Sequence, residues 1–179
     1  MFESIRLKAG TWYARMHFRS AKDPIMHFNN ILSSARHALV LLPETAGDGE
    51  VVMRVIEELR QKFLAGSFTV VSPPGSAVKF IAGQGSTLVR YSMDDLGLLF
   101  VPRSELLRKV KKSTFDVALD LNIRFALPSS YLCRASAAPL RIGFVKPYAD
   151  SFYNFQIQTG NSSNFTLVYS QLLKCIEMF

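Results

Sequence analysis

The sequence predicts an α/β domain built on a doubly wound, mostly parallel, Rossmann-like sheet with helices on both faces. From residue 37 onward, short apolar runs alternate with longer segments in which apolar residues recur at the spacing of a helix. Strands that alternate with helices are joined by right-handed crossovers, which make neighbouring strands parallel. With 179 residues, of which 49% are apolar, the chain has enough apolar side chains for one such core and a short appended arm.

The first half of this alternation contains two clear strands around one helix. HALVLLP, over 37–43, is a short apolar run that ends in proline, which is typical of a buried strand. Over 50–63 the apolar residues fall on one helical stripe, which predicts an amphipathic helix. SFTVVSP, over 67–73, predicts a second strand that proline stops. The runs at 87–92 and 96–101 are also strand-like, and they are close enough in sequence to pair with each other.

The second half continues the same alternation. RSELLRKVKKS, over 103–113, is predicted as a helix with its leucine and valine side chains inward and its basic side chains outward. The apolar runs at 115–122 and 140–145 are predicted as strands, and they flank a helix of small residues over 127–138. A strand over 152–159 and an amphipathic helix over the last seventeen residues complete the predicted domain.

Residues 1–36 precede this domain, which spans 37–179, and differ from it in composition. They contain six basic and two acidic residues, a net charge of +4 in a chain whose total is +7, with aromatic residues interspersed. Two interpretations stay open: a basic amphipathic arm on an anionic membrane surface, or one or two helices packed on the sheet domain or on a partner subunit. Pro24 is expected to break the arm into two pieces. The arm residues that we expect to make contacts are Trp12, Tyr13, Arg15 and Arg19.

The charge and the cysteine content limit the partners and the compartment. A pI of about 9.6 favours an anionic partner over a cationic one, although many basic proteins have no such partner. The two cysteines form no disulfide framework, and no segment approaches the roughly 20 apolar residues of a membrane span. We therefore expect a cytoplasmic protein, at most peripheral to the inner membrane. The three histidines match no metal-ligand spacing, and we expect no metal, cofactor or nucleic acid to bind.

Polar residues and glycines lie at the tips of several predicted strands. In parallel sheets of this kind, ligands bind beyond the carboxyl ends of the strands, so we expect a ligand-facing edge there. Asp48, in the turn after the first strand, is a candidate either for capping the following helix or for acting as a general base on a sugar hydroxyl. The residues that we place at this edge are Gly47, Asp48, Gly49, Asp120, Asn122, Arg141 and Gly143.

The stretch FDVALDLNIRFALPSSYLCRASAAPLRIGF, residues 115–144, resembles one known family. A strand ending in Asp-Leu, a helix of small residues and the sequence AAPLRIGF are similar to the N-terminal, acceptor-side domain of the ADP-heptose:lipopolysaccharide heptosyltransferases, glycosyltransferase family 9. Ala137 stands where the family usually has a glycine. The resemblance covers roughly residues 37–179 and implies half of a two-domain GT-B fold, without the C-terminal donor domain.

The resemblance also implies roles for single residues. The turn Ala46-Gly47-Asp48 looks like the family's Leu-Gly-Asp turn, whose aspartate is held to be the catalytic base, so Asp48 would be the base here. The C-terminal helix is similar to the helix that leads into the family's second domain. Because that second domain holds most of the nucleotide-sugar contacts, we do not expect a nucleotide sugar to bind to this chain alone.

These expectations lead to three hypotheses for a bacterial protein of this kind. The first is a single-domain heptosyltransferase-like protein without independent transferase activity, which serves as a binding or scaffold subunit and contacts protein partners through the arm and the strand-end edge. The second is the acceptor-side half of a split glycosyltransferase, with Asp48 as general base. The third is a peripheral membrane-binding module that uses residues 1–36. We expect the first, in which the chain is not an enzyme on its own.

Overall fold

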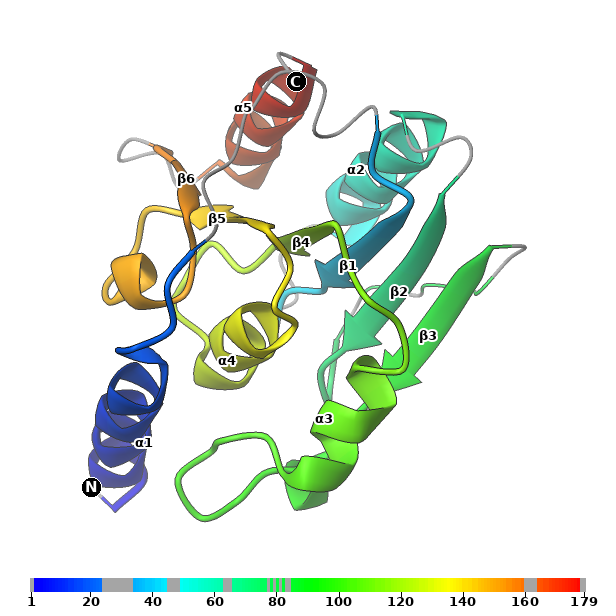
Figure 1. Ribbon diagram of the computed structural model, residues 1–179. Helices are drawn as coiled ribbons and strands as arrows, with labels where there is room; N and C mark the ends of the chain where they lie inside the picture. The colour runs from blue at the N-terminus through cyan, green and yellow to red at the C-terminus, as the bar shows by residue number, and fades with distance from the viewer. Residues whose placement is uncertain are drawn as a thin grey trace.

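A parallel sheet of six strands forms the centre of the protein (Figure 1). The computed structural model describes residues 2–23, 34–44, 49–62, 66–76, 78, 80, 82, 85–159 and 164–177. Within these residues the strand order is β3-β2-β1-β4-β5-β6, and every neighbouring pair is parallel. The strands are β1 (His37–Leu41), β2 (Ser67–Ser72), β3 (Ser86–Arg90), β4 (Val117–Asp120), β5 (Leu140–Phe144) and β6 (Phe155–Ile157).

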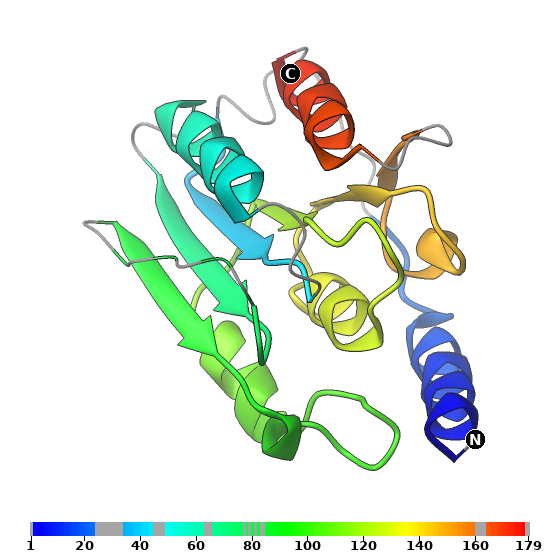
Figure 2. The same ribbon diagram turned by 180° about the vertical axis from the view of Figure 1, so that it is seen from behind.

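Helices cover both faces of this sheet. The described helices are α1 (Phe2–Phe18), α2 (Gly49–Lys62), α3 (Ser104–Val110), α4 (Leu127–Ala135), α5 (Phe165–Glu177) and the short 3-10 helices η1 (Met93–Asp95) and η2 (Ala149–Ser151). Helices α2 and α5 lie together on one face, and α1, α3 and α4 lie on the other, as Figure 1 and the reverse view in Figure 2 show. The predicted doubly wound α/β architecture is confirmed.

Strand β1 illustrates how the sheet is buried on both sides. Ala38 and Val40 point into the core shared with α2 and α5, whereas Leu39 and Leu41 point into the core shared with α3 and α4. Successive side chains of a strand point to opposite faces, so a strand between two helical layers must be apolar throughout. The uninterrupted apolar run in the sequence reflects this double burial.

The predicted strand at 96–101 is wrong. After η1 the chain turns back on itself: the Gly97 amide donates to the Val101 carbonyl at 2.8 Å, and the Phe100 amide donates to the Gly97 carbonyl at 3.0 Å. Phe100 has a φ of 58°, a left-handed conformation that ends any strand. The neighbouring strand β3 pairs with β2 instead. The backbone of this loop lies against helix α1 at Gly10, and Leu98 is exposed, an arrangement that an apolar run in the sequence cannot distinguish from a strand.

Residues 2–18 of the predicted arm form α1, which packs on α4 and on this loop. The Nε of Arg6 donates to the Leu98 carbonyl at 2.6 Å, and its guanidinium lies 4.6 Å from the centre of the Phe100 ring. The buried residues of α1 are small ones, Gly10, Thr11 and Ala14. Most of its large apolar side chains are exposed, whereas Phe18 packs on the Tyr131 ring with ring centres 4.9 Å apart. Binding of the arm to a membrane surface or to a partner subunit stays a prediction. Pro24 lies outside the described residues.

The end of α4 provides a prediction about stability. Ala137, which stands where the resemblance expects glycine, has a φ of 57°, in the left-handed region. We expect Ala137→Gly to raise the free energy of unfolding by roughly 1 kcal/mol, because this conformation costs a residue with a Cβ about 1–2 kcal/mol. Urea denaturation measures the change. Ala135→Gly, at the last residue of α4, should instead lower it by up to about 1 kcal/mol, and an equal loss in both variants would contradict the assignment.

Candidate functional site

A cavity of about 460 Å³ opens at the carboxyl ends of strands β1 to β4. Its walls come from residues that follow these strands, from the loop after η1 and from the start of α1. The residues that line its sheet side are Glu44, Pro74, Tyr91, Phe125, Ala126 and Pro128. Cavities of this size hold small ligands, and this edge of a doubly wound sheet is where such folds bind them.

Glu44 and Tyr91 are the ionisable pair at this cavity. Glu44 is an exposed residue overall, but the Tyr91 hydroxyl donates a hydrogen bond to its carboxylate at the cavity wall. Partial burial of the carboxyl group raises the pKa of Glu44, and the negative charge of Asp120 adds to this effect. Burial also raises the pKa of Tyr91, so its hydroxyl stays protonated and remains a donor. The pair offers one acceptor and one hydroxyl to a ligand.

Behind the cavity, Asp120 at the end of β4 is the centre of a buried hydrogen-bond network. Its Oδ1 accepts from the Asn122 amide at 3.0 Å, from Asn122 Nδ2 at 2.7 Å and from Ser129 Oγ at 2.9 Å. Its Oδ2 accepts from Lys146 Nζ at 3.0 Å and from the Tyr153 hydroxyl. All of these donors belong to the protein, so the carboxylate is fully occupied by the fold itself.

Lys146 and Asp120 form an ion pair inside the domain, with side chains that are 2% and 0% exposed. Lys146 Nζ also donates to the Asn122 carbonyl at 2.6 Å and lies 4.9 Å from the centre of the Tyr153 ring. Burial, and then the charge of Asp120, raises the pKa of Tyr153 well above its ordinary value, which keeps its hydroxyl a donor. A buried charge is tolerated only with such partners.

Asn122 connects this network to the cavity wall. Its Oδ1 accepts from the Glu44 amide at 2.8 Å, and its Nδ2 donates to the Leu42 carbonyl at 3.1 Å. The chain that leaves β1 is thereby held against the chain that leaves β4. Asp120 and Asn122 lie at the predicted edge, but both are buried, and their observed bonds position Glu44. Direct contact of either side chain with a ligand stays a prediction.

Gly143 and Arg141 both lie in β5, but they contact different parts of the structure. A Cβ at Gly143 would approach the Tyr153 ring to 2.8 Å, so glycine is what allows that ring to reach Asp120. Arg141 lies near the start of β5, not at its carboxyl end, and is buried. Its guanidinium donates to the Ala138 carbonyl at 2.7 Å and to the Phe152 carbonyl at 3.0 Å. The structure therefore does not bring Arg141 together with the residues around Glu44.

The turn that carries the predicted base is not part of the described structure. Gly47 and Asp48 lie outside the described residues, and Gly49 is the first residue of α2. The role of Asp48 as a base therefore stays a prediction.

The predicted contact residues of the arm lie on or just after α1. Trp12 is 65% exposed, and Tyr13 stacks on His17 with ring centres 5.9 Å apart. Arg15 donates from Nε to Ser151 Oγ at 3.1 Å, and Arg19 is exposed. Contact with a partner stays a prediction for all four.

Three residues of this region were not predicted from the sequence: Glu44, Tyr91 and Lys146. Each follows a strand within three residues, so the signal was a polar side chain directly after a buried parallel strand. That signal identified Asp120 and Asn122. After the first strand and in the strand at 140–145, the same signal pointed instead to Gly47, Asp48 and Gly49 and to Arg141 and Gly143. Tyr153 carries no such signal, because its position depends on how the crossover between β5 and β6 folds back over the sheet.

Two further properties of the described residues concern metals and membranes. Over the part of the chain that the structure describes, no three His, Cys, Asp or Glu side chains gather where they could hold a metal ion. In the same residues, no helix combines the length and the apolar character that crossing a bilayer requires.

Comparison with known proteins finds a solved structure with a similar fold. Neither a family model nor a curated protein matches this sequence. Among solved structures, the chain is similar to E. coli heptosyltransferase WaaC with ADP-2-deoxy-2-fluoro heptose, with a TM-score of 0.60 and 13% sequence identity. The similarity covers 80% of this chain and 49% of that one, so the chain spans about half the length of the heptosyltransferase.

At this identity the likeness shows the fold alone. The resemblance to heptosyltransferases that the sequence indicated is therefore confirmed as a glycosyltransferase-like, Rossmann-type fold. Activity, ligand and partners do not follow from a shared fold, because one fold hosts many functions.

Proposed function

We propose that these 179 residues form a glycosyltransferase-like binding domain that has no transferase activity by itself and serves as a binding or scaffold subunit of a larger assembly. The observation that carries this proposal is the cavity at the carboxyl ends of β1 to β4, where Glu44 and Tyr91 present a carboxylate and a hydroxyl. The oxygen atoms of such a pair can accept hydrogen bonds from the hydroxyl groups of a ligand such as a sugar.

Group transfer requires more than this cavity supplies. A donor and an acceptor must be held together in a reactive geometry, and fixing that geometry accounts for much of the rate enhancement. In a two-domain transferase the donor is held by the second domain, whereas this chain matches about half of the heptosyltransferase. The arm and the strand-end edge would be the contact surfaces for a protein partner.

The test has two parts. The purified chain, incubated with an ADP- or UDP-sugar and an acceptor sugar, is expected to form no product above a blank without protein. Affinity purification of the native protein is expected to retrieve a stable assembly. Respectable turnover by the chain alone would overturn the first part of the proposal, and recovery of the chain without any partner would overturn the second.

A second candidate is the acceptor-side half of a split transferase, and the raised pKa of Glu44 favours it. A carboxylate with a raised pKa is a stronger base than an ordinary one, and Glu44 follows the same strand as Asp48. In a pair reconstituted with a donor-binding domain, Asp48→Asn and Glu44→Gln separate the two possible bases. If Glu44 is the base, the rate should fall as the pH falls through its raised pKa. Retained activity in both variants would remove this candidate.

A further inference from the structure

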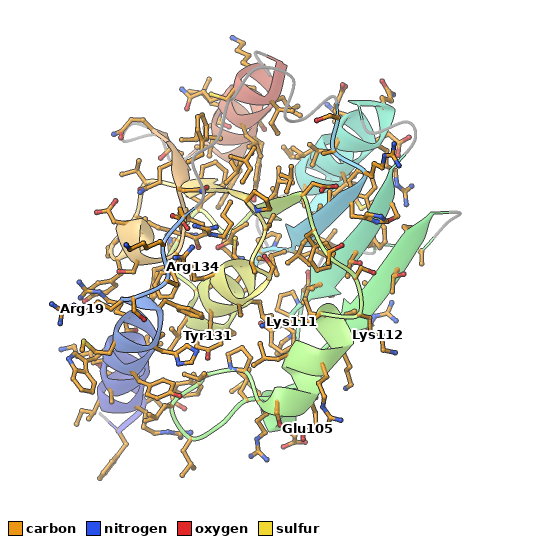
Figure 3. All side chains as sticks on the ribbon, in the orientation of Figure 1. Arg19, Glu105, Lys111, Lys112, Tyr131 and Arg134 are labelled. Carbon is orange, nitrogen blue, oxygen red and sulfur yellow. The ribbon has the colours of Figure 1, made fainter. Side chains whose placement is uncertain are left out.

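A second cavity, of about 480 Å³, lies between the C-terminal half of α1, helix α4 and the crossover from β5 to β6. Among the described residues that line it are four arginines and two aspartates, a net charge of +2. In Figure 3, Arg134 lies on α4 near the segment that follows α1, and Arg19 lies further out, beside the end of α1. These charged residues are Arg15, Arg19, Asp23, Arg134, Arg141 and Asp150.

The inner wall of this cavity contains two buried guanidinium groups that share one carboxylate oxygen. Arg141 Nη2 lies 2.5 Å from Asp23 Oδ1, and Arg134 Nη1 bonds to the same atom. The arginine side chains are 3% and 9% exposed, and that of Asp23 is 38% exposed. One carboxylate offsets only one of the two positive charges, so the inner wall keeps a positive excess away from bulk water.

The pKa shifts of Arg141 and Asp23 agree with this positive excess at the inner wall. Burial lowers the pKa of Arg141, and repulsion from the charge of Arg134 lowers it further. Burial acts to raise the pKa of Asp23, but the hydrogen bonds from the two arginines hold it below its ordinary value. Asp23 is therefore ionised, and the two guanidinium groups still repel each other across it.

The outer wall adds two arginines and an aromatic ring. Arg15 is held in place by its bond to Ser151, and its guanidinium lies 5.3 Å from the centre of the Tyr148 ring. Arg19 and Trp12 are exposed at the rim. The ion pairs of Asp23 secure it to α4 and β5, and Arg134 also donates to the Ala21 carbonyl at 2.5 Å. This structural role does not account for Arg15 and Arg19, which bring further positive charge to the same cavity.

We propose that this cavity binds the phosphate group of a phosphorylated small molecule or of a lipid headgroup, with Arg15 and Arg19 bonded to the phosphate and the Trp12 ring against the rest of the ligand. Guanidinium groups match phosphate oxygens through paired hydrogen bonds, and several of them around one cavity favour phosphate over a single carboxylate. The site is separate from the cavity at Glu44, and the inference does not rest on the proposed function.

Trp12 gives a direct measurement, because it is the single tryptophan of the chain and lines the cavity. Titration of the full chain with inorganic pyrophosphate at low salt should change its fluorescence in a saturable way. Arg15→Gln/Arg19→Gln should weaken binding by roughly tenfold or more. The matched control is Lys111→Gln/Lys112→Gln, which removes the same charge from the end of α3, on the opposite side of Figure 3 from Arg19. The control should bind as the unchanged protein does.

Asp23→Asn distinguishes a binding site from a purely structural ion pair. It removes the carboxylate that competes with an anionic ligand, so pyrophosphate should bind more tightly, by severalfold. A purely structural role predicts a change in stability without a gain in affinity. If Asp23→Asn does not fold, Asp150→Asn removes the other acidic residue of the lining and should also tighten binding.

Vesicles identify the source of the phosphate. Sedimentation with vesicles that contain phosphatidylglycerol, compared with pure phosphatidylcholine, tests the headgroup. Binding that pyrophosphate displaces and Arg15→Gln/Arg19→Gln abolishes supports a lipid headgroup, and a pyrophosphate response without sedimentation supports a soluble compound. The proposal is overturned if pyrophosphate at about 10 mM leaves Trp12 unchanged and no vesicle binds. It is equally overturned if the α1 and α3 double variants lose affinity alike.

Discussion

Asp120→Ala is expected to lower the free energy of unfolding by about 3–5 kcal/mol, which is the cost of leaving a buried charge without its partner. Lys146, whose side chain is 2% exposed, would keep its ammonium group inside the domain with only the Asn122 carbonyl among its former acceptors. The Tyr153 hydroxyl and Ser129 Oγ would lose the acceptor that they share. A loss of this size is a large part of the stability of an ordinary domain.

Urea denaturation of three variants tests this prediction. Asp94→Ala, at an exposed aspartate, is the control and should change stability by less than about 0.5 kcal/mol. Asp120→Ala/Lys146→Met removes both charges and should be more stable than Asp120→Ala alone, because no unpaired ammonium remains. A loss below about 1 kcal/mol in Asp120→Ala would show that the network does not hold the strand ends together.

Gly10→Ala is expected to release α1 from the sheet domain and to lower stability by about 2–3 kcal/mol. A Cβ at residue 10 would lie 2.0 Å from the Leu99 carbonyl oxygen and 2.9 Å from Leu127 Cδ2. The nearest atom belongs to the backbone of the loop at 96–101, which cannot move aside as a flexible side chain does. The direction of the change in stability is informative, because replacing glycine with alanine in an unconstrained helix raises the free energy of unfolding by about 1 kcal/mol.

Hydrogen exchange locates the effect within the molecule. In Gly10→Ala the amides of α1 should exchange faster, whereas those of α5 should keep their protection, because α5 packs on α2 and β6. Ala9→Gly, at the exposed neighbouring position, should cost about 1 kcal/mol by helix propensity alone. If Gly10→Ala instead stabilises the protein, α1 does not make the close contact with Leu99.

The fold could be predicted from the sequence wherever a segment is buried on both faces or on one regular face. The run at 37–43 became β1, and the apolar stripe at 50–63 became α2, because a sheet between two helical layers requires those patterns. The run at 96–101 has the composition of a strand but lies under α1. The Leu99 backbone contacts a helix far away in the sequence, while Leu98 stays exposed, and no local pattern encodes that arrangement.

Part of the candidate site could likewise be predicted from the sequence, and part of it could not. The sequence by itself determined that polar residues follow the strands, and a parallel sheet then brings Asp120 and Asn122 to its carboxyl edge. The tertiary structure alone decided that these two are buried, that Glu44 and Tyr91 face the cavity, and that Arg141 joins Asp23 on another surface. The parallel direction of the strands follows from the alternation of strands and helices, whereas the strand order and the exposure of a side chain depend on which distant segments pack together.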